Sequence, residues 1–287
     1  MLKEQTLCFQ SQGSWLNGIV HVPNGDCSGQ GVVIVVGGPQ TRVGSHRQFL
    51  LLARTLAANG HHVLRFDYHG NGDSEGDAGS FINCQQDIAL ALQIFKERYP
   101  KVRELNLWGL CDAASAILLY CKQANEPQVA RLVLLNPWVT TTHLQAQTML
   151  RHYYLRKLFD KALWRKLAHG KFNVFQSLKD LAVHAKSALS APKQKEVAKK
   201  HKPTLDNYVA LMLQGLTDFS GEVLFILSGN DLVAAEFELL MAKDAEWKEA
   251  CGESKVTISR IAGATHTFSS EVWRREVEAL TQSMLAP

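Results

Sequence analysis

Short runs of β-branched residues alternate with longer amphipathic stretches along most of this chain, and this alternation limits the folds available to it. The clearest run, residues 31–36, is Gly-Val-Val-Ile-Val-Val, which is typical of a strand buried on both faces of a parallel sheet. Residues 45–59 follow with a helical pattern that puts Phe49 and Leu56 on one face, and Gly60 is a stop signal. Repetition of this unit predicts an α/β fold with a mostly parallel sheet covered by helices.

The same patterns recur through the rest of the chain. Further strands are expected at 5–10, 16–22, 62–68, 104–109, 131–135, 222–228 and 255–261. Further helices are expected at 80–98, 112–122, 234–250 and 269–285. The chain has 287 residues, 46% of them hydrophobic, which is enough to bury one large core.

Residues 136–217 interrupt the alternation and are mainly helical in pattern. We therefore expect a core formed by 1–135 and 218–287, with a helical insertion, 136–217, over the carboxyl ends of the strands, where ligands bind. From Arg151 to Lys202 there are fourteen Lys or Arg residues against three acidic ones. Such charge predicts attraction of an anionic substrate, an anionic carrier or a membrane surface, with a solvated helix face as the alternative. No recognised nucleic-acid-binding module accompanies it.

Several classes of protein are disfavoured by composition. No segment approaches the roughly 20 apolar residues of a membrane span, and the first ten residues lack a signal-peptide apolar stretch. None of the six cysteines forms a C-x-x-C pair, so a metal site is not expected. The Gly-rich segment 67–74 is not G-x-G-x-x-G, so no nucleotide cofactor is expected. We expect a cytoplasmic protein with reduced thiols and no cofactor.

The sharpest motif is the segment Gly109-Leu110-Cys111-Asp112-Ala113, at the junction of an expected strand and an expected helix. This is the context of a nucleophile elbow of the G-x-S-x-G type, with Cys111 in place of Ser and Ala113 in place of the last Gly. The positive end of the helix dipole is expected to favour a thiolate at Cys111. The N–H of Asp112 is expected to face a developing oxyanion. The alternative is a buried structural cysteine.

A nucleophile of this kind needs a base and a group that orients the base. His266 follows the last expected strand, and Asp231 follows the strand before it. Both therefore belong to the sheet edge that carries Cys111, in the chain order nucleophile, acid, histidine. An ordinary loop histidine and an aspartate in a turn are the alternatives.

A second oxyanion donor is expected in the loop after the strand 31–36. Pro39 has no N–H, so Gly38 is the first candidate and Gln40 the second. A structural Gly-Pro turn is the alternative.

Five further residues are candidates for substrate binding. Arg42, His46 and Arg47 lie just beyond the oxyanion loop and have the chemistry to hold an anionic group, with solvated surface charge as the alternative. Trp138 and His143 follow the strand 131–135 and are candidates to line the pocket, with a packed aromatic as the alternative for Trp138.

The order of these motifs resembles the α/β-hydrolase superfamily over nearly the whole chain. More narrowly, five segments are similar to the exosortase A system-associated hydrolases: Gly37–Gln40, Arg42–Phe49, Trp108–Asp112, Leu135–Val139 and His152–Leu155. The resemblance implies a bacterial, cytosolic hydrolase or acyltransferase near exopolysaccharide synthesis, without defining its substrate. The cysteine nucleophile also resembles that of dienelactone hydrolases, whose flanking motifs differ from those found here.

These residues predict hydrolysis of an acyl substrate through a thioester intermediate on Cys111. His266 moves the proton, Asp231 orients the imidazole, and the N–H groups of Gly38 and Asp112 stabilise the oxyanion. Esters, thioesters and lactones are the expected substrates.

Three alternatives to hydrolysis use the same chain. Acyl transfer to another acceptor would use the same residues as hydrolysis. A non-catalytic binding protein on the same fold is the second alternative. A redox sensor at Cys111 is the third, but the next cysteine, Cys121, lies about 15 Å along the same helix, which is too far for a disulfide.

Overall fold

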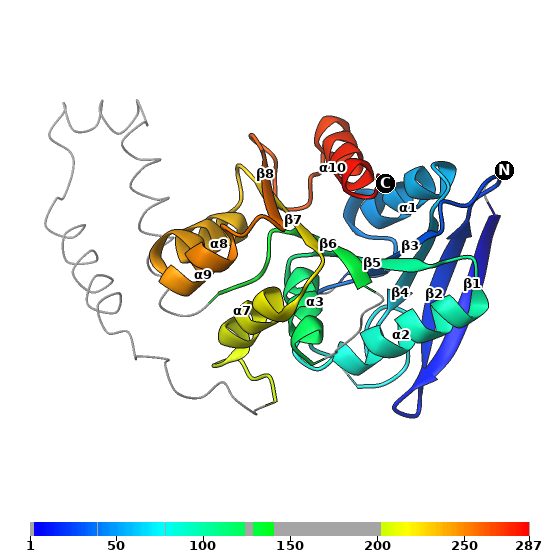
Figure 1. Cartoon of the computed structure of the whole chain (residues 1–287). Helices are drawn as coiled ribbons and strands as arrows, with labels where there is room; N and C mark the ends of the chain where they lie inside the picture. The colour runs from blue at the N-terminus through cyan, green and yellow to red at the C-terminus, as the bar shows by residue number, and fades with distance from the viewer. Residues whose placement is uncertain (1–2, 39, 78, 124–128, 141–201, 287) are drawn as a thin grey trace, which may run out of the picture.

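The computed structural model describes residues 3–38, 40–77, 79–123, 129–140 and 202–286. Within them, one sheet has the strand order β1-β2-β4-β3-β5-β6-β7-β8 (Figure 1). The strands are β1 (Lys3–Ser11), β2 (Ser14–Val22), β3 (Gln30–Val35), β4 (His62–Asp67), β5 (Glu104–Leu110), β6 (Val129–Leu135), β7 (Glu222–Ser228) and β8 (Val256–Ile261). The β1–β2 and β2–β4 pairs are antiparallel and the other pairs are parallel, which confirms the mostly parallel sheet.

Helices cover both faces of the sheet. They are α1 (Gln48–Ala58), α2 (Gln85–Arg98), α3 (Asp112–Gln123), α7 (Tyr208–Asp218), α8 (Leu232–Lys243), α9 (Ala245–Ala250) and α10 (Glu271–Met284), and a 3₁₀ turn, η1 (Ser45–Arg47), precedes α1. Helices α1 and α10 lie together on one face, and α2, α3 and α7 lie on the other, with α8 and α9 beside them (Figure 1).

The β-branched run of β3 is buried on both faces, as its composition predicts. Val33 and Val35 belong to the apolar cluster under α2 and α3, and Val32 and Ile34 belong to the cluster under α1 and α10. Because β3, β5, β6, β7 and β8 all run in the same direction, the loops after their carboxyl ends meet at one edge of the sheet.

Three expected helices differ from the prediction. The expected helix 80–98 begins only at Gln85, because residues 81–83 form a turn in which the Asn83 N–H donates to the carbonyl of Ser80 at 2.9 Å. The expected helix 234–250 is two helices, because Asp244 has an extended backbone and its side chain caps the first turn of α9. The expected helix 45–59 becomes α-helical only after η1, because His46 and Arg47 have φ angles of 54° and 61°, outside the helical region.

The expected insertion is described only at its two ends. Residues 141–201, which contain almost all of the basic segment, lie outside the described residues, so the partners predicted from its charge stay predictions. At the far end, α7 packs along α3, with Met212 and Leu216 fully buried. The division of the chain at 136 and 217 also stays a prediction. Over the residues that the structure describes, no helix is both long enough and apolar enough to span a membrane.

Buried histidine His21 gives the fold a predicted sensitivity to acid. Its side chain is fully buried and its Nε2 accepts from Nε of Arg65 at 3.0 Å, so the ring is neutral. Burial, and then the Arg65 charge, lower the His21 pKa from 6.5 to about 4. The unfolded chain therefore binds a proton that the folded chain does not, and stability falls as the pH drops from about 6.5 to about 4. We expect His21 to account for a loss of about 2 kcal/mol at pH 5 relative to pH 7.5.

Urea unfolding at both pH values, on the wild type and on His21→Gln, measures this loss. The variant should lose about 2 kcal/mol less than the wild type on acidification. Equal losses in the two proteins would assign the acid sensitivity to other groups, such as His61 and His62, whose pKa values burial also lowers.

Candidate active site

Cys111 occupies a strained turn between β5 and α3. Its φ angle is 63°, a left-handed conformation that is uncommon for a residue with a side chain. A Cβ at Gly109 would lie 2.7 Å from Cδ1 of Ile117 and 2.9 Å from the carbonyl carbon of Ala113, so the turn requires a glycine there. The Cys111 N–H donates to the carbonyl of Leu135 at 2.8 Å, which ties the turn to β6. This is the geometry of a nucleophile elbow.

His266 and Asp231 meet at the same edge of the sheet. Nδ1 of His266 lies 2.8 Å from Oδ2 of Asp231, although the two residues are on separate loops. The same carboxylate accepts from the N–H of Ala234 at 3.1 Å as the N-cap of α8, and this contact holds it in place. The His266 side chain is 32% exposed and that of Asp231 is 8% exposed, so the imidazole faces a space that solvent reaches.

The electrostatics at Cys111 contradict the expectation of a thiolate. Burial, followed by the negative charge of Asp112, raises the pKa of the Cys111 thiol to about 12. The N–H of Asp112 opposes this change, and the charge of Asp231 adds to it. The prediction from the helix dipole was therefore wrong, because desolvation and the neighbouring carboxylates outweigh the dipole. Within the described part of the chain, no hydrogen bond joins the thiol to His266.

The expected oxyanion loop is oriented towards Asp112. The Gly38 N–H donates to Oδ2 of Asp112 at 2.7 Å, so this donor is already occupied by a carboxylate. The N–H of the second candidate, Gln40, points back to the carbonyl of Gly37 at 3.4 Å. Pro39 lies outside the described residues.

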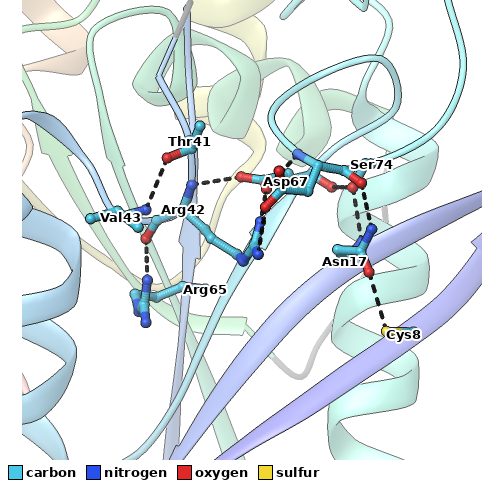
Figure 2. A network of polar contacts seen from close by, with 9 residues as sticks. Cys8, Asn17, Thr41, Arg42, Val43, Arg65, Asp67 and Ser74 are labelled. Carbon is cyan, nitrogen blue, oxygen red and sulfur yellow. Dashed lines mark hydrogen bonds and ion pairs between the residues drawn. The ribbon is translucent and has the colours of Figure 1, made fainter.

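Arg42 is held by two carboxylates, and Figure 2 shows its contacts with one of them, Asp67. Its guanidinium pairs with Asp67, which is fully buried, and with Asp73, at 2.7 Å. Its backbone N–H also donates to Asp67 at 2.6 Å, and its carbonyl accepts from the buried Arg65. The positive charge of Arg42 is thus balanced inside the protein, and its contacts fix the loop between β3 and α1.

The other candidate substrate-binding residues are dispersed. His46 and Arg47 are exposed in η1. Trp138 is half-buried, and its backbone N–H donates to the carbonyl of Cys111 at 3.3 Å, which places its backbone beside Cys111. His143 lies outside the described residues.

Comparison with known proteins identifies the family. The family model described as Serine aminopeptidase, S33 matches residues 28–272, which is most of the chain. The chain belongs to the S33 family. This match and the sheet confirm the expected α/β-hydrolase fold. The family description names a serine, whereas this S33 member has Cys111 at the elbow.

Solved structures share the fold of this S33 member at low identity. An esterase of Pyrococcus furiosus, Pf2001, has a TM-score of 0.63 and 14% identity, over 99% of this chain and 90% of that chain. Est1E of Butyrivibrio proteoclasticus, solved with ferulic acid bound, has a TM-score of 0.61 and 15% identity, over 98% of this chain and 100% of that chain. No curated protein matches the chain in sequence.

Two residues that hold the histidine loop of this S33 member are not evident from its sequence. The Asn136 side chain donates to Ser228 Oγ at 2.7 Å and to the carbonyl of His266 at 3.1 Å. Ser228 Oγ in turn donates to the carbonyl of Thr265 at 3.0 Å. Asn136 has a φ of 42°, so its backbone is also strained. The only signal in the sequence is an Asn-Pro pair directly after a strand, which predicts a turn.

An acidic group near the elbow was also missed. Glu236 is buried in α8 and its carboxylate accepts from the Thr140 hydroxyl, while the Tyr208 hydroxyl donates to the Thr140 carbonyl at 3.0 Å. Burial raises the pKa of Glu236, and the charge of Asp231 raises it further. The sequence gives no sign that this mid-helix glutamate is buried, because its burial depends on which residues pack against the helix.

A polar cavity of about 510 Å³ is lined by a different set of residues. Its lining includes His69, Asn83, Gln85 and Lys202, and none of the three candidate catalytic residues. We therefore base the function on the elbow and not on this cavity.

Proposed function

We propose that this protein hydrolyses ester, thioester or lactone bonds through an acyl-enzyme on Cys111, with His266 as base and Asp231 as the residue that orients it. The observation that carries the proposal is the 2.8 Å contact between Nδ1 of His266 and Asp231 on the sheet edge that bears the strained Cys111 turn. A nucleophile at an elbow with a base oriented by a carboxylate is the arrangement that acyl transfer needs.

The contacts of His266 and the pKa of Cys111 indicate which of their atoms carry protons. A carboxylate only accepts hydrogen bonds, so Nδ1 of His266 carries the ring proton and Nε2 has a free lone pair. With its pKa raised to about 12, Cys111 is a thiol at neutral pH, so His266 must take the proton as Sγ attacks the carbonyl carbon. The imidazolium then protonates the leaving alcohol or thiol. Water, activated by His266, attacks the thioester and releases the acid and the free thiol.

The bond class follows from the leaving groups. A thiolate leaves a tetrahedral intermediate more readily than an amine, so an amide returns to reactants unless its nitrogen is protonated. Alkoxide and thiolate leaving groups compete better, which favours esters and thioesters. The similar structure of Pyrococcus furiosus, Pf2001, is described as an esterase, which supports this choice. We also propose, from the resemblance of the segments around Gly38 and Cys111, that the activity serves exopolysaccharide synthesis in the bacterial cytoplasm.

Replacement of Cys111 tests the proposal. We expect Cys111→Ala to lower kcat/KM for 4-nitrophenyl acetate by about 10³-fold or more, because the covalent route is lost. Acid-quenched wild type should gain the mass of one acetyl group on the Cys111 peptide, and His266→Ala should acylate much more slowly. Cys8→Ala, which changes an exposed cysteine, is the matched control and should keep full activity.

The same assay separates hydrolysis from its rivals. Product analysis with added alcohols would reveal acyl transfer as a new ester in place of the free acid. A Cys111→Ala protein as active as the wild type, with no acyl-Cys111 in the wild type, would refute the proposed mechanism. Absence of any acylation across esters and thioesters would instead favour a binding protein on the same fold.

A further inference from the structure

The Asp112 carboxylate lies where the oxyanion of the proposed reaction would bind, against the Gly38 N–H. Its Oδ2 accepts from the Gly38 N–H at 2.7 Å. A Cβ at Gly37 would lie 2.0 Å from Oδ1 and 2.7 Å from the backbone nitrogen of Ala113, so only a glycine leaves room for the carboxylate there. The Gly37-Gly38 turn thus fits closely around the Asp112 side chain.

The Gly38 N–H is one of the two donors that the proposed mechanism needs. In this fold the oxyanion is bound by the N–H of the residue after the nucleophile and by an N–H of the loop after β3, which are Asp112 and Gly38 here. The Asp112 carboxylate takes the hydrogen bond of the Gly38 N–H, so this donor is not free for an oxyanion. Its negative charge also opposes a second negative charge at the same place, as it already opposes ionisation of the Cys111 thiol.

We propose that Asp112 controls the rate of the reaction by occupying the oxyanion hole of the resting enzyme, so that a substrate carbonyl must displace its carboxylate from Gly38 before Cys111 can attack. This inference rests on the proposed function. Burial raises the pKa of the Asp112 carboxyl, because it removes water from the charged form. The Gly38 N–H opposes this change. Asp112 is therefore a positioning residue that acts through Gly38.

Removal of the Asp112 carboxylate tests the proposal directly. Loss of one oxyanion donor costs about 10²–10³-fold in other hydrolases, so freeing the Gly38 N–H in Asp112→Ala should raise kcat/KM for 4-nitrophenyl acetate about tenfold or more. Asp112→Asn removes the charge but keeps an oxygen that accepts from Gly38, so it should give a smaller rise. Asp218→Ala, an exposed aspartate paired with Lys122, is the matched control and should change nothing.

Two further readouts keep the test decisive. An aryl trifluoromethyl ketone adds to Cys111 by forming a C–S bond, with the thiol proton passing to His266 and the carbonyl oxygen becoming an oxyanion. Its Ki should fall in Asp112→Ala by the same factor. The Gly38 amide proton, observed by ¹H–¹⁵N NMR, should lie far downfield in the wild type and move upfield in Asp112→Ala, whether or not the protein is active.

The outcomes separate the two proposals. If Cys111→Ala abolishes activity but folded Asp112→Ala is no faster than the wild type, the proposed function stands and the inference about Asp112 is wrong. If Cys111→Ala is fully active, the proposed function fails. A Gly38 resonance that is the same in the wild type and in folded Asp112→Ala overturns the inference. If the alanine variant does not fold, an Asp112→Asn enzyme that is no faster than the wild type overturns it.

Discussion

Replacement of Asp231 by asparagine should lower kcat/KM for ester hydrolysis by about 10³- to 10⁴-fold and lower the free energy of unfolding by no more than about 1 kcal/mol. The loss has a specific cause. The carboxylate accepts from Nδ1 of His266 at 2.8 Å, and an amide that turns its NH₂ towards the ring would favour the tautomer with the proton on Nε2. The base would then have no lone pair facing the thiol.

The loss of stability should stay small. The Ala234 N–H donates at 3.1 Å to Oδ2, the same oxygen that contacts His266, so an amide that turns its NH₂ towards the ring gives up this N-cap contact, which is worth about 1 kcal/mol. Activity assays and urea unfolding on Asp231→Asn measure the two effects separately.

The matched control for this prediction is another helix cap. Asp244 caps α9 through the N–H groups of Glu246 and Trp247 but has no contact with the candidate site. Asp244→Ala should cost about 1 kcal/mol of stability and leave kcat/KM unchanged. An Asp231→Asn enzyme with wild-type activity would remove Asp231 from the mechanism, and a loss of several kcal/mol would make its role structural.

Replacement of Asp67 by alanine should destabilise the protein by about 3–5 kcal/mol. Asp67 is fully buried and accepts from the Arg42 backbone N–H at 2.6 Å and from the Arg42 guanidinium (Figure 2). It also accepts from the Asp73 N–H at 3.2 Å. Its removal leaves the guanidinium of Arg42 without its buried partner, next to the buried Arg65. The cost therefore comes mainly from uncompensated buried charge.

Asp73 offers a matched comparison on the same guanidinium. Its side chain is 71% exposed, and it lies 2.7 Å from Nη2 of Arg42. Because solvent screens this pair, Asp73→Ala should cost at most about 1 kcal/mol. Urea unfolding of the two variants measures the difference, and equal costs would show that burial does not decide the strength of these contacts.

The fold could be predicted to a large extent because it depends on local periodicity. The pattern predicts a strand over 222–228, and β7 has those bounds. The β-branched run of β3 predicts burial on both faces, and its side chains enter both apolar clusters. The predictions failed where a local backbone choice overrode a helical pattern, at η1 and at Asp244, because a cap or a left-handed residue contributes little to a periodicity.

The candidate site could be predicted in part. The sequence alone determined that Cys111, Asp231 and His266 follow three strands of a parallel sheet, and therefore that they share one edge. It did not determine the ionisation of Cys111, since burial and nearby carboxylates outweigh the helix dipole. Nor did it reveal the Asn136 contact that holds the histidine loop.

Only the tertiary structure decided which donor meets which acceptor. Asp112 contacts Gly38 across 74 residues of chain, His266 meets Asp231 across 35, and Arg42 meets Asp67 across 25. Strand and helix periods are properties of neighbouring residues, so they can be read from the sequence. A hydrogen bond depends on atoms being a few ångströms apart at a set angle, and for residues so distant in the chain that geometry exists only once the sheet and its helices have packed.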